Sequence, residues 1–239
     1  MPIVFFHSAS YRYFAVVSLI LNIETAVTGA SICLSKSEQP TGYKGTTAQK
    51  ETASWLQPAI QELCRECGIS LKDLSAIAVS AGPGSYTGLR VGMASAKGLC
   101  YALGIPLITI NTLQLMAAAA LPASMLLCPM IDARRMEVFT AIYDTSLKEV
   151  QPTAPLVLDQ NSFSEVLGKE PVLFFGNGSD KFQSLTQHPN ALFKGIAFNA
   201  TNMASLAVAA FERKQFADLA YSEPFYGKAF YSPGFSPSV

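Results

Sequence analysis

Small polar and apolar residues alternate in two runs that follow the first eighteen positions of the chain. This pattern predicts half-buried strands at Leu19–Ile23 and Gly29–Leu34, joined as a hairpin, and leaves open a third strand before the next helix. Short, continuously apolar runs predict buried strands at Ala76–Val79 and Leu107–Ile110. Four or five strands are therefore expected in the first half of the chain.

Two helices separate these strands. Apolar residues recur every three or four positions between about Ala48 and Cys67, which predicts an amphipathic helix. A second helix is expected over Thr87–Leu103, because Gly104 supplies a C-terminal cap and Pro106 a stop. Between them, Ser70 and Asp73 resemble a capping box on a short helical turn.

The second half repeats this order loosely. A helix at Thr112–Ala120 and an amphipathic helix at Asn202–Lys214 enclose three expected strands. No element is assigned to Gln151–Gln160, which is rich in proline and polar residues. The three strands are Leu126–Ile131, Val138–Tyr143 and Val172–Phe175.

The order β, β, α, β, α, with an optional third strand, is that of a ribonuclease-H-like unit, so we expect an α/β protein of two related lobes. The first lobe is expected to span residues 18–108 and to be joined by the C-terminal helical region, about 202–226. The second lobe is expected to span 109–201, and 227–239 to form a tail.

Residues 1–17 form an N-terminal extension that is apolar and aromatic. Its one basic residue, Arg12, lies in the middle, whereas a signal peptide carries its positive charge first. The apolar run Tyr13–Ile23 is shorter than the roughly 20 residues of a membrane helix. We expect no membrane segment and interpret Met1–Val16 as a misassigned start, with Val17 encoded by an alternative initiation codon.

The amino-acid composition limits the kinds of ligand that the chain is expected to bind. The 17 basic and 17 acidic residues cancel, so independent binding of nucleic acid is not expected. Five cysteines, an odd number, indicate a reducing compartment such as the cytoplasm, and we interpret all of them, including Cys64-x-x-Cys67 late in a helix, as structural. The two histidines, His7 and His188, provide no paired metal-binding pattern, so no metal site is expected.

A glycine-rich segment, Gly82 to Arg90, connects a buried strand to a helix. Its backbone N–H groups suit a phosphate at a helix N-terminus, but the spacing matches neither familiar phosphate loop, and a tight turn is the favoured interpretation. The candidate ligand-binding residues are Gly82, Gly84, Ser85, Thr87 and Arg90.

The helix that follows is nearly bare of side chains on one side, because Gly88, Gly92 and Ala96 lie four apart. Glycine inside a helix costs roughly 1 kcal/mol relative to alanine, so these residues require a packing partner. The partner is either the rest of the fold or a helix of another subunit. Together with Trp55 and Ala59, this side is the candidate docking face, and Gly92→Leu is expected to abolish association without disturbing the fold.

Two polar turns in the second half are further candidates. The cluster Asp132-Ala133-Arg134-Arg135-Met136-Glu137 joins two expected strands and suits either an anionic ligand or a solvated turn. The sequence Gly176-Asn177-Gly178 follows a buried strand, and we favour a turn there as well.

Three motifs together resemble the TsaB family, also called YeaZ, over Ser18 to about Tyr226. They are Asn22-Ile23-Glu24-Thr25, the run Gly82-Pro83-Gly84-Ser85-Tyr86-Thr87-Gly88-Leu89-Arg90 with Ala96-Lys97-Gly98-Leu99 behind it, and Asp132 to Val138. The resemblance implies two ribonuclease-H-like lobes of the actin-like ATPase (ASKHA) superfamily. It also implies kinship with TsaD, which transfers threonylcarbamoyl to adenosine 37 of tRNA.

The resemblance further implies a non-catalytic subunit that binds a TsaD-like catalyst through first-lobe helices, with a TsaE-like ATPase joining the complex. Contact with tRNA is then indirect, no cofactor is bound by the chain itself, ATP has a place at the complex interface, and a homodimer is compatible with the same face. Glu24-Thr25-Ala26 and Thr52-Ala53 depart from the family's Asp-Thr-Ser and His-Ser. The alternatives are a glycoprotease-like metallopeptidase or an actin-like ATPase or kinase, but the chain lacks their ligands, and no catalytic residue is expected.

Overall fold

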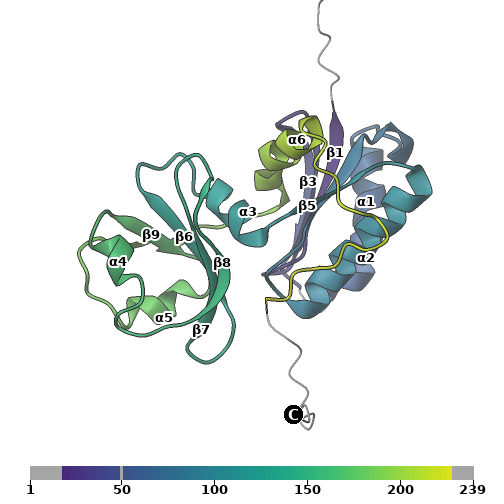
Figure 1. Ribbon diagram of the computed structural model, residues 1–239. Coiled ribbons are helices and arrows are strands. Elements are labelled where there is room, and N and C mark those ends of the chain that lie inside the picture. The colour runs from purple at the N-terminus through teal and green to yellow at the C-terminus, as the bar shows by residue number, and fades with distance from the viewer. Residues whose placement is uncertain (1–17, 49–50, 228–239) are drawn as a thin grey trace, which may run out of the picture.

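The computed structural model describes residues 18–48 and 51–227, which form two lobes side by side (Figure 1). The expectations for the N-terminal extension, its alternative start, His7 and nearly all of the tail lie outside these residues. No helix in the described part of the chain combines the length and apolar character needed to cross a membrane.

The first lobe is built on a five-stranded mixed sheet in the order β3-β2-β1-β4-β5. The central strand β1 pairs antiparallel with β2 and parallel with β4, and β4 pairs parallel with β5. The third strand that the sequence left open is present as β3. The strands are β1 (Leu19–Glu24), β2 (Ala30–Lys36), β3 (Gln39–Thr46), β4 (Ala76–Ser80) and β5 (Leu107–Ile110).

The second lobe repeats this topology, in the order β10-β9-β6-β7-β8 with β6 at the centre. The segment to which no element was assigned contains most of β8, an edge strand. Pro152 and Pro155 are tolerated there because an edge strand leaves half of its backbone groups unpaired. The strands are β6 (Leu126–Asp132), β7 (Glu137–Tyr143), β8 (Glu149–Val157), β9 (Val172–Phe175) and β10 (Ala191–Phe193).

Two long helices cover one face of the first sheet (Figure 1). The first, α1 (Thr52–Glu66), begins later than the expected Ala48, and α2 (Tyr86–Leu103) ends at Gly104 in the left-handed conformation, as predicted. Leu56, Ile60 and Leu63 of α1 pack with the sheet in one core cluster. The capping box at Ser70 and Asp73 is confirmed on the turn η2 (Leu71–Asp73).

The helices that follow the last strand of each sheet cross between the lobes. Helix α3 (Thr112–Ala119) follows β5, yet Leu113 and Met116 pack against the second sheet. The turn η3 (Ala200–Met203) and α6 (Ala204–Glu212) follow β10 but pack on the first sheet. The second lobe's own helices, α4 (Ser164–Leu167) and α5 (Ser179–Gln183), are short. Each sheet is thus covered in part by helices that follow the last strand of the other sheet.

Candidate functional site

The carboxyl ends of the parallel strands in both sheets carry loops that line a cleft. Such strand ends are where open α/β sheets bind ligands, because the loops diverge there and leave a crevice. The cleft has a volume of about 1100 Å³, and the residues that line it include Glu24, Thr28 and Gly176. An adjoining hollow of about 700 Å³ shares Val27, Thr28 and Asn177 with it.

The glycine-rich segment after β4 has a counterpart in the second lobe. Gly82-Pro83-Gly84-Ser85 follows β4, and Gly176-Asn177-Gly178-Ser179 follows the topologically equivalent β9. Gly82 and Gly176 have φ values of 104° and 98°, a region that favours glycine. A Cβ on Gly84 would clash with Ala26, two residues beyond the end of β1, and one on Gly178 would meet the end of β6. Both turns therefore use glycine to pack two strand ends tightly, as the favoured interpretation held.

The candidate phosphate-loop residues do not lie around one common site. Gly84, Ser85 and Thr87 line the smaller hollow, opposite Asp132 and Arg134. The Ser85 hydroxyl accepts a hydrogen bond from the Gly88 N–H and so caps α2. Gly82 lies against Phe225 instead, and Arg90 donates to the Tyr86 hydroxyl at 2.9 Å on the exposed side of the helix.

The bare side of α2 faces the interior of its own lobe, so the docking face predicted there is wrong in four of its five residues. Gly88 and Gly92 lie so close to Thr25 that a Cβ on either would clash, and Thr25 Oγ1 donates to the Gly88 carbonyl at 2.8 Å. Ala96 and Ala59 are buried in the first-lobe core. The close approach of β1 to α2 is the packing partner that the glycines required.

The opposite side of α2 is exposed, and beyond Arg90 it carries small and aromatic residues. Ala94, Gly98 and Ala102 are exposed, Val91 is half-buried, and Tyr101 is 83% exposed. We call these five residues the α2 ridge. Apart from its chain neighbours and the backbone of its own helix, no described atom lies within 4 Å of a Cβ placed on Gly98. Trp55 of α1 is half-buried against the first-lobe core and keeps part of its surface exposed.

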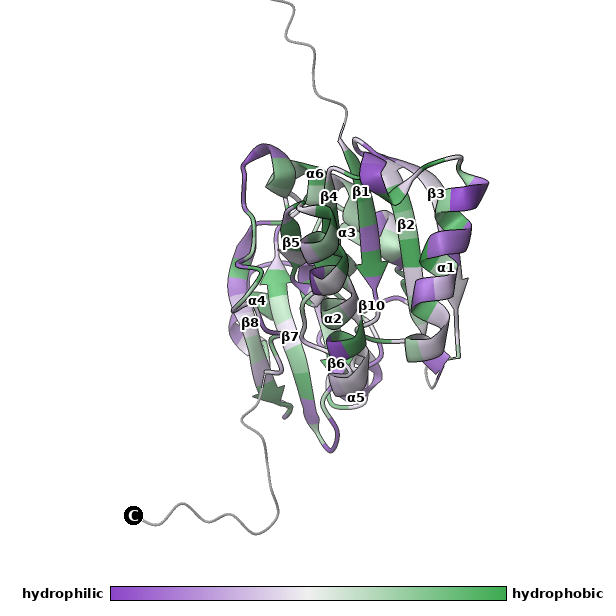
Figure 2. Ribbon diagram, turned by 90° about the vertical axis from the view of Figure 1, so that its right-hand side faces the viewer, coloured by the Kyte–Doolittle hydropathy of each residue, from purple (hydrophilic) through white to green (hydrophobic). Residues whose placement is uncertain are grey.

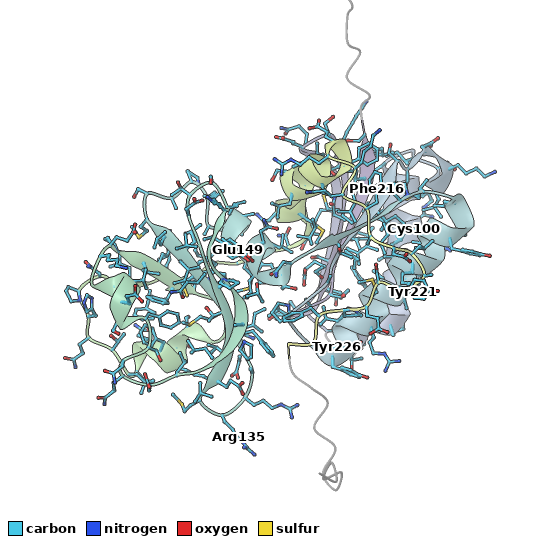
Figure 3. All side chains as sticks on the ribbon, in the orientation of Figure 1. Cys100, Arg135, Glu149, Phe216, Tyr221 and Tyr226 are labelled. Carbon is cyan, nitrogen blue, oxygen red and sulfur yellow. The ribbon has the colours of Figure 1, made fainter. Side chains whose placement is uncertain are left out.

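The polar turn between β6 and β7 is held by an ion pair. Lys181 Nζ lies 2.6 Å from Asp132 Oδ1, and this contact holds the pKa of Asp132 below its usual range. Arg134 and Arg135 adopt positive φ values of 69° and 50°. Figure 3 shows Arg135 at the far tip of the second lobe, pointing away from the protein.

The topologically equivalent acid of the first lobe, Glu24 at the end of β1, has no such cation among the described residues. It is 5% exposed; Oε1 accepts from the Ala26 N–H at 2.6 Å, while Oε2 is buried with no hydrogen-bond partner among the described residues. Burial raises the pKa of Glu24 to about 7, although the nearby Ser80 hydroxyl and the N–H groups of Ala26 and Val27 lower it in part. The sequence showed this residue only as a departure from an aspartate.

The C-terminal segment after α6 belonged to the helical region expected over about 202–226, but it is not helical beyond α6. It runs along α2 towards the glycine-rich loop (Figure 1). Lys97 Nζ donates to the carbonyls of Ala220 and Ser222 at 3.1 and 3.0 Å. The Tyr226 ring lies 4.9 Å from that of Tyr86, and Figure 3 shows Tyr221 and Tyr226 along this path. We call residues 216–227 the strap.

The cysteines occupy the positions expected of core residues. Cys33, Cys64, Cys100 and Cys128 are buried, Cys67 is half-buried, and none of these is in a disulfide. Burial raises the pKa of Cys100 to about 11, so its thiol stays protonated at neutral pH. The described ranges contain no group of three or more histidine, cysteine or acidic residues arranged to hold a metal ion.

Comparison with known proteins identifies the family. A family model described as TsaD, tRNA N6-adenosine threonylcarbamoyltransferase, matches residues 30–228. The tRNA threonylcarbamoyladenosine biosynthesis protein TsaB of Bacillus subtilis is 32% identical over 173 residues, covering 70% of this chain and 75% of that protein. The Escherichia coli protein of the same name is 35% identical over 127 residues, covering 52% of this chain and 54% of that protein.

A solved structure shows the same fold. YeaZ from Pseudomonas aeruginosa superimposes with a TM-score of 0.75 at 23% identity, covering 87% of this chain and 99% of that one. The duplicated sheets, the paired glycine turns and the match over 75% of the Bacillus subtilis protein lead to one conclusion: this chain belongs to the TsaB (YeaZ) family.

Proposed function

We propose that this chain acts in the formation of threonylcarbamoyladenosine in tRNA, as a non-catalytic subunit that binds a TsaD-like transferase. The names of its relatives support the pathway. The α2 ridge is the observation that supports the binding role, because it places an apolar, low-relief helix surface on the outside of the first lobe. In Figure 2, α2 faces the viewer and carries fewer strongly hydrophilic residues than α1 beside it.

The ridge suits a helix of another protein better than a small molecule. Helices approach to about 8–10 Å when small residues line the contact, and Ala94 and Gly98 supply them. Tyr101, at 83% exposed, offers the large aromatic surface that dominates protein interfaces. Trp55, the one residue of the sequence-based docking face that keeps exposed surface, belongs to the neighbouring α1.

The remaining components follow from this role. A TsaE-like ATPase joins the complex, ATP binds at an interface of that complex, and the TsaD-like subunit supplies the contact with tRNA. The equal numbers of acidic and basic residues favour indirect contact, since tRNA binding relies on surplus positive charge. The complex works in the cytoplasm, where its substrate is found.

The same ridge also suits a second copy of this chain. A face that receives a related fold can receive its own, and an isologous contact closes at two subunits. The homodimer would then compete with the TsaD-like partner for the α2 ridge.

Reconstitution tests the role. Threonylcarbamoyladenosine formation on tRNA is measured with TsaC, TsaD and TsaE from one organism, with and without this chain. We expect product only when the chain is present. Equal product in its absence would remove the proposed function.

A matched pair of variants tests the surface. Ala94→Arg places a charge on the ridge at little cost to the helix, and Ala154→Arg makes the same change on the exposed edge strand β8. We expect Ala94→Arg to lose TsaD in a pull-down and Ala154→Arg to retain it. Equal retention by both variants would place the interface elsewhere.

A further inference from the structure

The strap is fastened to the first lobe along its length. At its start, the Ala217 N–H donates to the carbonyl of Leu107 on β5 at 2.8 Å, and in its middle Lys97 of α2 holds two of its carbonyls. Near its end, the Phe225 N–H donates to the Ala81 carbonyl at 2.7 Å. Each such bond contributes on the order of 1 kcal/mol, so the strap moves with the first lobe.

The end of the strap lies between the two lobes. On one side, the Phe225 carbonyl lies so close to Gly82 that a Cβ on this glycine would clash with it. On the other side, the backbone of Gly227 lies against the ring of Phe139, on β7 of the second lobe, and a Cβ on Gly227 would clash with that ring. Gly227 has a φ of 74°, which favours glycine. Backbone therefore fills the gap between a first-lobe turn and a second-lobe strand, with no room for a side chain at either contact.

Both walls of this gap are held in place. Phe139 is 7% exposed and packs in the core of the second lobe. Gly82 exchanges two hydrogen bonds with Thr112: its N–H donates to the Thr112 hydroxyl at 3.1 Å, and its carbonyl accepts from the Thr112 N–H at 2.9 Å. Close-packed interiors have few voids that could absorb a displacement, so a change in the thickness of the strap is passed on to the lobes.

The gap adjoins one of the connections between the lobes. The described chain crosses from one lobe to the other between β5 and α3 and again between β10 and η3. Thr112, the partner of Gly82, is the first residue of α3. Rotations of one domain against another pivot on a few residues in such connections, so a small displacement beside them turns a whole lobe.

We infer that the strap is a spacer whose end sets the angle between the two lobes. Gly227 keeps the strap thin enough for Phe139 to rest against it, and the hydrogen bonds to the first lobe keep that end in the gap. The spacer does not depend on the proposed partner role, because its contacts are made by the strap, Gly82 and Phe139 and not by the α2 ridge.

The angle is measured on the full chain as the distance between two spin labels, one on each lobe, by pulsed electron paramagnetic resonance. The labels are attached at Gln61→Cys on α1 and at Glu170→Cys beyond α4, both exposed positions, with Cys67→Ser in the background. The four buried cysteines stay unlabelled, because buried, protonated thiols react slowly.

Gly227→Leu is the test variant and Gly68→Leu is its control. The two glycines have similar φ values, 74° and 65°, but apart from chain neighbours no described atom lies within 4 Å of a Cβ on Gly68. At position 227, leucine forces Phe139 away or drives the strap out of the gap. Because carbon atoms in contact rest about 3.5–4.0 Å apart, we expect the label distance to shift, or its distribution to widen, by about 2 Å or more. Gly68→Leu should match the wild type.

Phe225→Pro tests the same spacer without adding bulk beside Phe139. It removes the N–H that binds the Ala81 carbonyl, so we expect the end of the strap to leave the gap and the distance distribution to widen. Wild-type label distances in Gly227→Leu or in Phe225→Pro would overturn the proposal. Circular dichroism controls for folding, and if Gly227→Leu does not fold, Phe225→Pro alone decides.

Discussion

The two lobes share one sheet topology but differ in the helices that cover it. The outer helices of the first lobe, α1 and α2, have 15 and 18 residues, whereas the equivalent α4 and α5 of the second lobe have 4 and 5. The strand-end loops are nevertheless alike, with Gly-x-Gly-Ser turns after β4 and β9. The two lobes are therefore alike at the strand ends and unlike in the outer layer of helices.

Helices α5 and α2 illustrate two roles: α5 only covers a sheet, whereas α2 also has an exposed outer face. A helix that only covers a sheet needs an apolar inner face, as Phe182 of α5 supplies in the second lobe. Helix α2 has an inner face fitted to Thr25 and, in addition, an outer ridge of small and aromatic residues. The proposed partner surface therefore lies on the first lobe.

Gly92→Leu should have the largest effect, because the new side chain would collide with Thr25 and Val79 inside the first lobe. We expect a loss of about 3 kcal/mol or more in the free energy of unfolding, measured by urea denaturation. Gly98→Leu, on the outer side, should instead gain up to about 1 kcal/mol from helix propensity. Equal stability of the two variants would contradict the assignment of the two faces. The sequence-based expectation that Gly92→Leu leaves the fold intact is wrong for this reason.

Glu24→Gln should have the next largest effect on stability, through its pH dependence. It tests the acid at the end of β1, whose counterpart in the second lobe is Asp132. Because the folded pKa of Glu24 is raised from 4.5 to about 7, its stabilising contribution is complete below pH 4.5 and is lost as the pH rises through 7. Relative to Glu24→Gln, the wild type should lose about 3 kcal/mol between pH 4.5 and pH 8. Urea denaturation of both proteins across this range measures it, and parallel pH profiles would show that Glu24 ionises normally.

Lys97→Met should release the strap from α2. The variant keeps the length of the side chain but removes the donors to the carbonyls of Ala220 and Ser222. We therefore expect the free energy of unfolding to fall by about 1 kcal/mol. Hydrogen exchange should accelerate in the strap and remain unchanged in the second lobe. Lys36→Met, at an exposed position at the end of β2, is the control and should leave exchange in the strap as it is.

Asp132→Asn should have the smallest effect, because Asp132 is a partly exposed acid paired with Lys181. Its pKa is lowered, so its contribution is present above the ordinary value of 3.8 and is lost as the pH falls below it. Solvent screening limits the loss at neutral pH to less than about 1 kcal/mol. Urea denaturation of both proteins at pH values above and below 3.8 measures this loss, and a wild-type advantage that grows as the pH falls below 3.8 would contradict the sign.

The sequence by itself determined most of the elements and the family. Strands such as Leu107–Ile110 and Val172–Phe175 agree residue for residue with the structure, because short apolar runs between turn signals have few alternatives. The run from Gly82 to Arg90 carried the family resemblance. Strand β8 was not predicted, because its prolines and polar residues lack the alternating pattern of a strand. It is recognisable as a strand only by its pairing with β7.

Only the tertiary structure decided which side of α2 is free. Small residues occur on both sides, Gly88 and Gly92 on one and Ala94 and Gly98 on the other, so the sequence pattern does not distinguish an inner face from an outer one. The contact with Thr25, more than 60 residues away in the chain, makes the choice. The isolation of Glu24 was likewise hidden, because burial and the lack of a cation depend on what the fold brings near a residue and not on its neighbours in sequence.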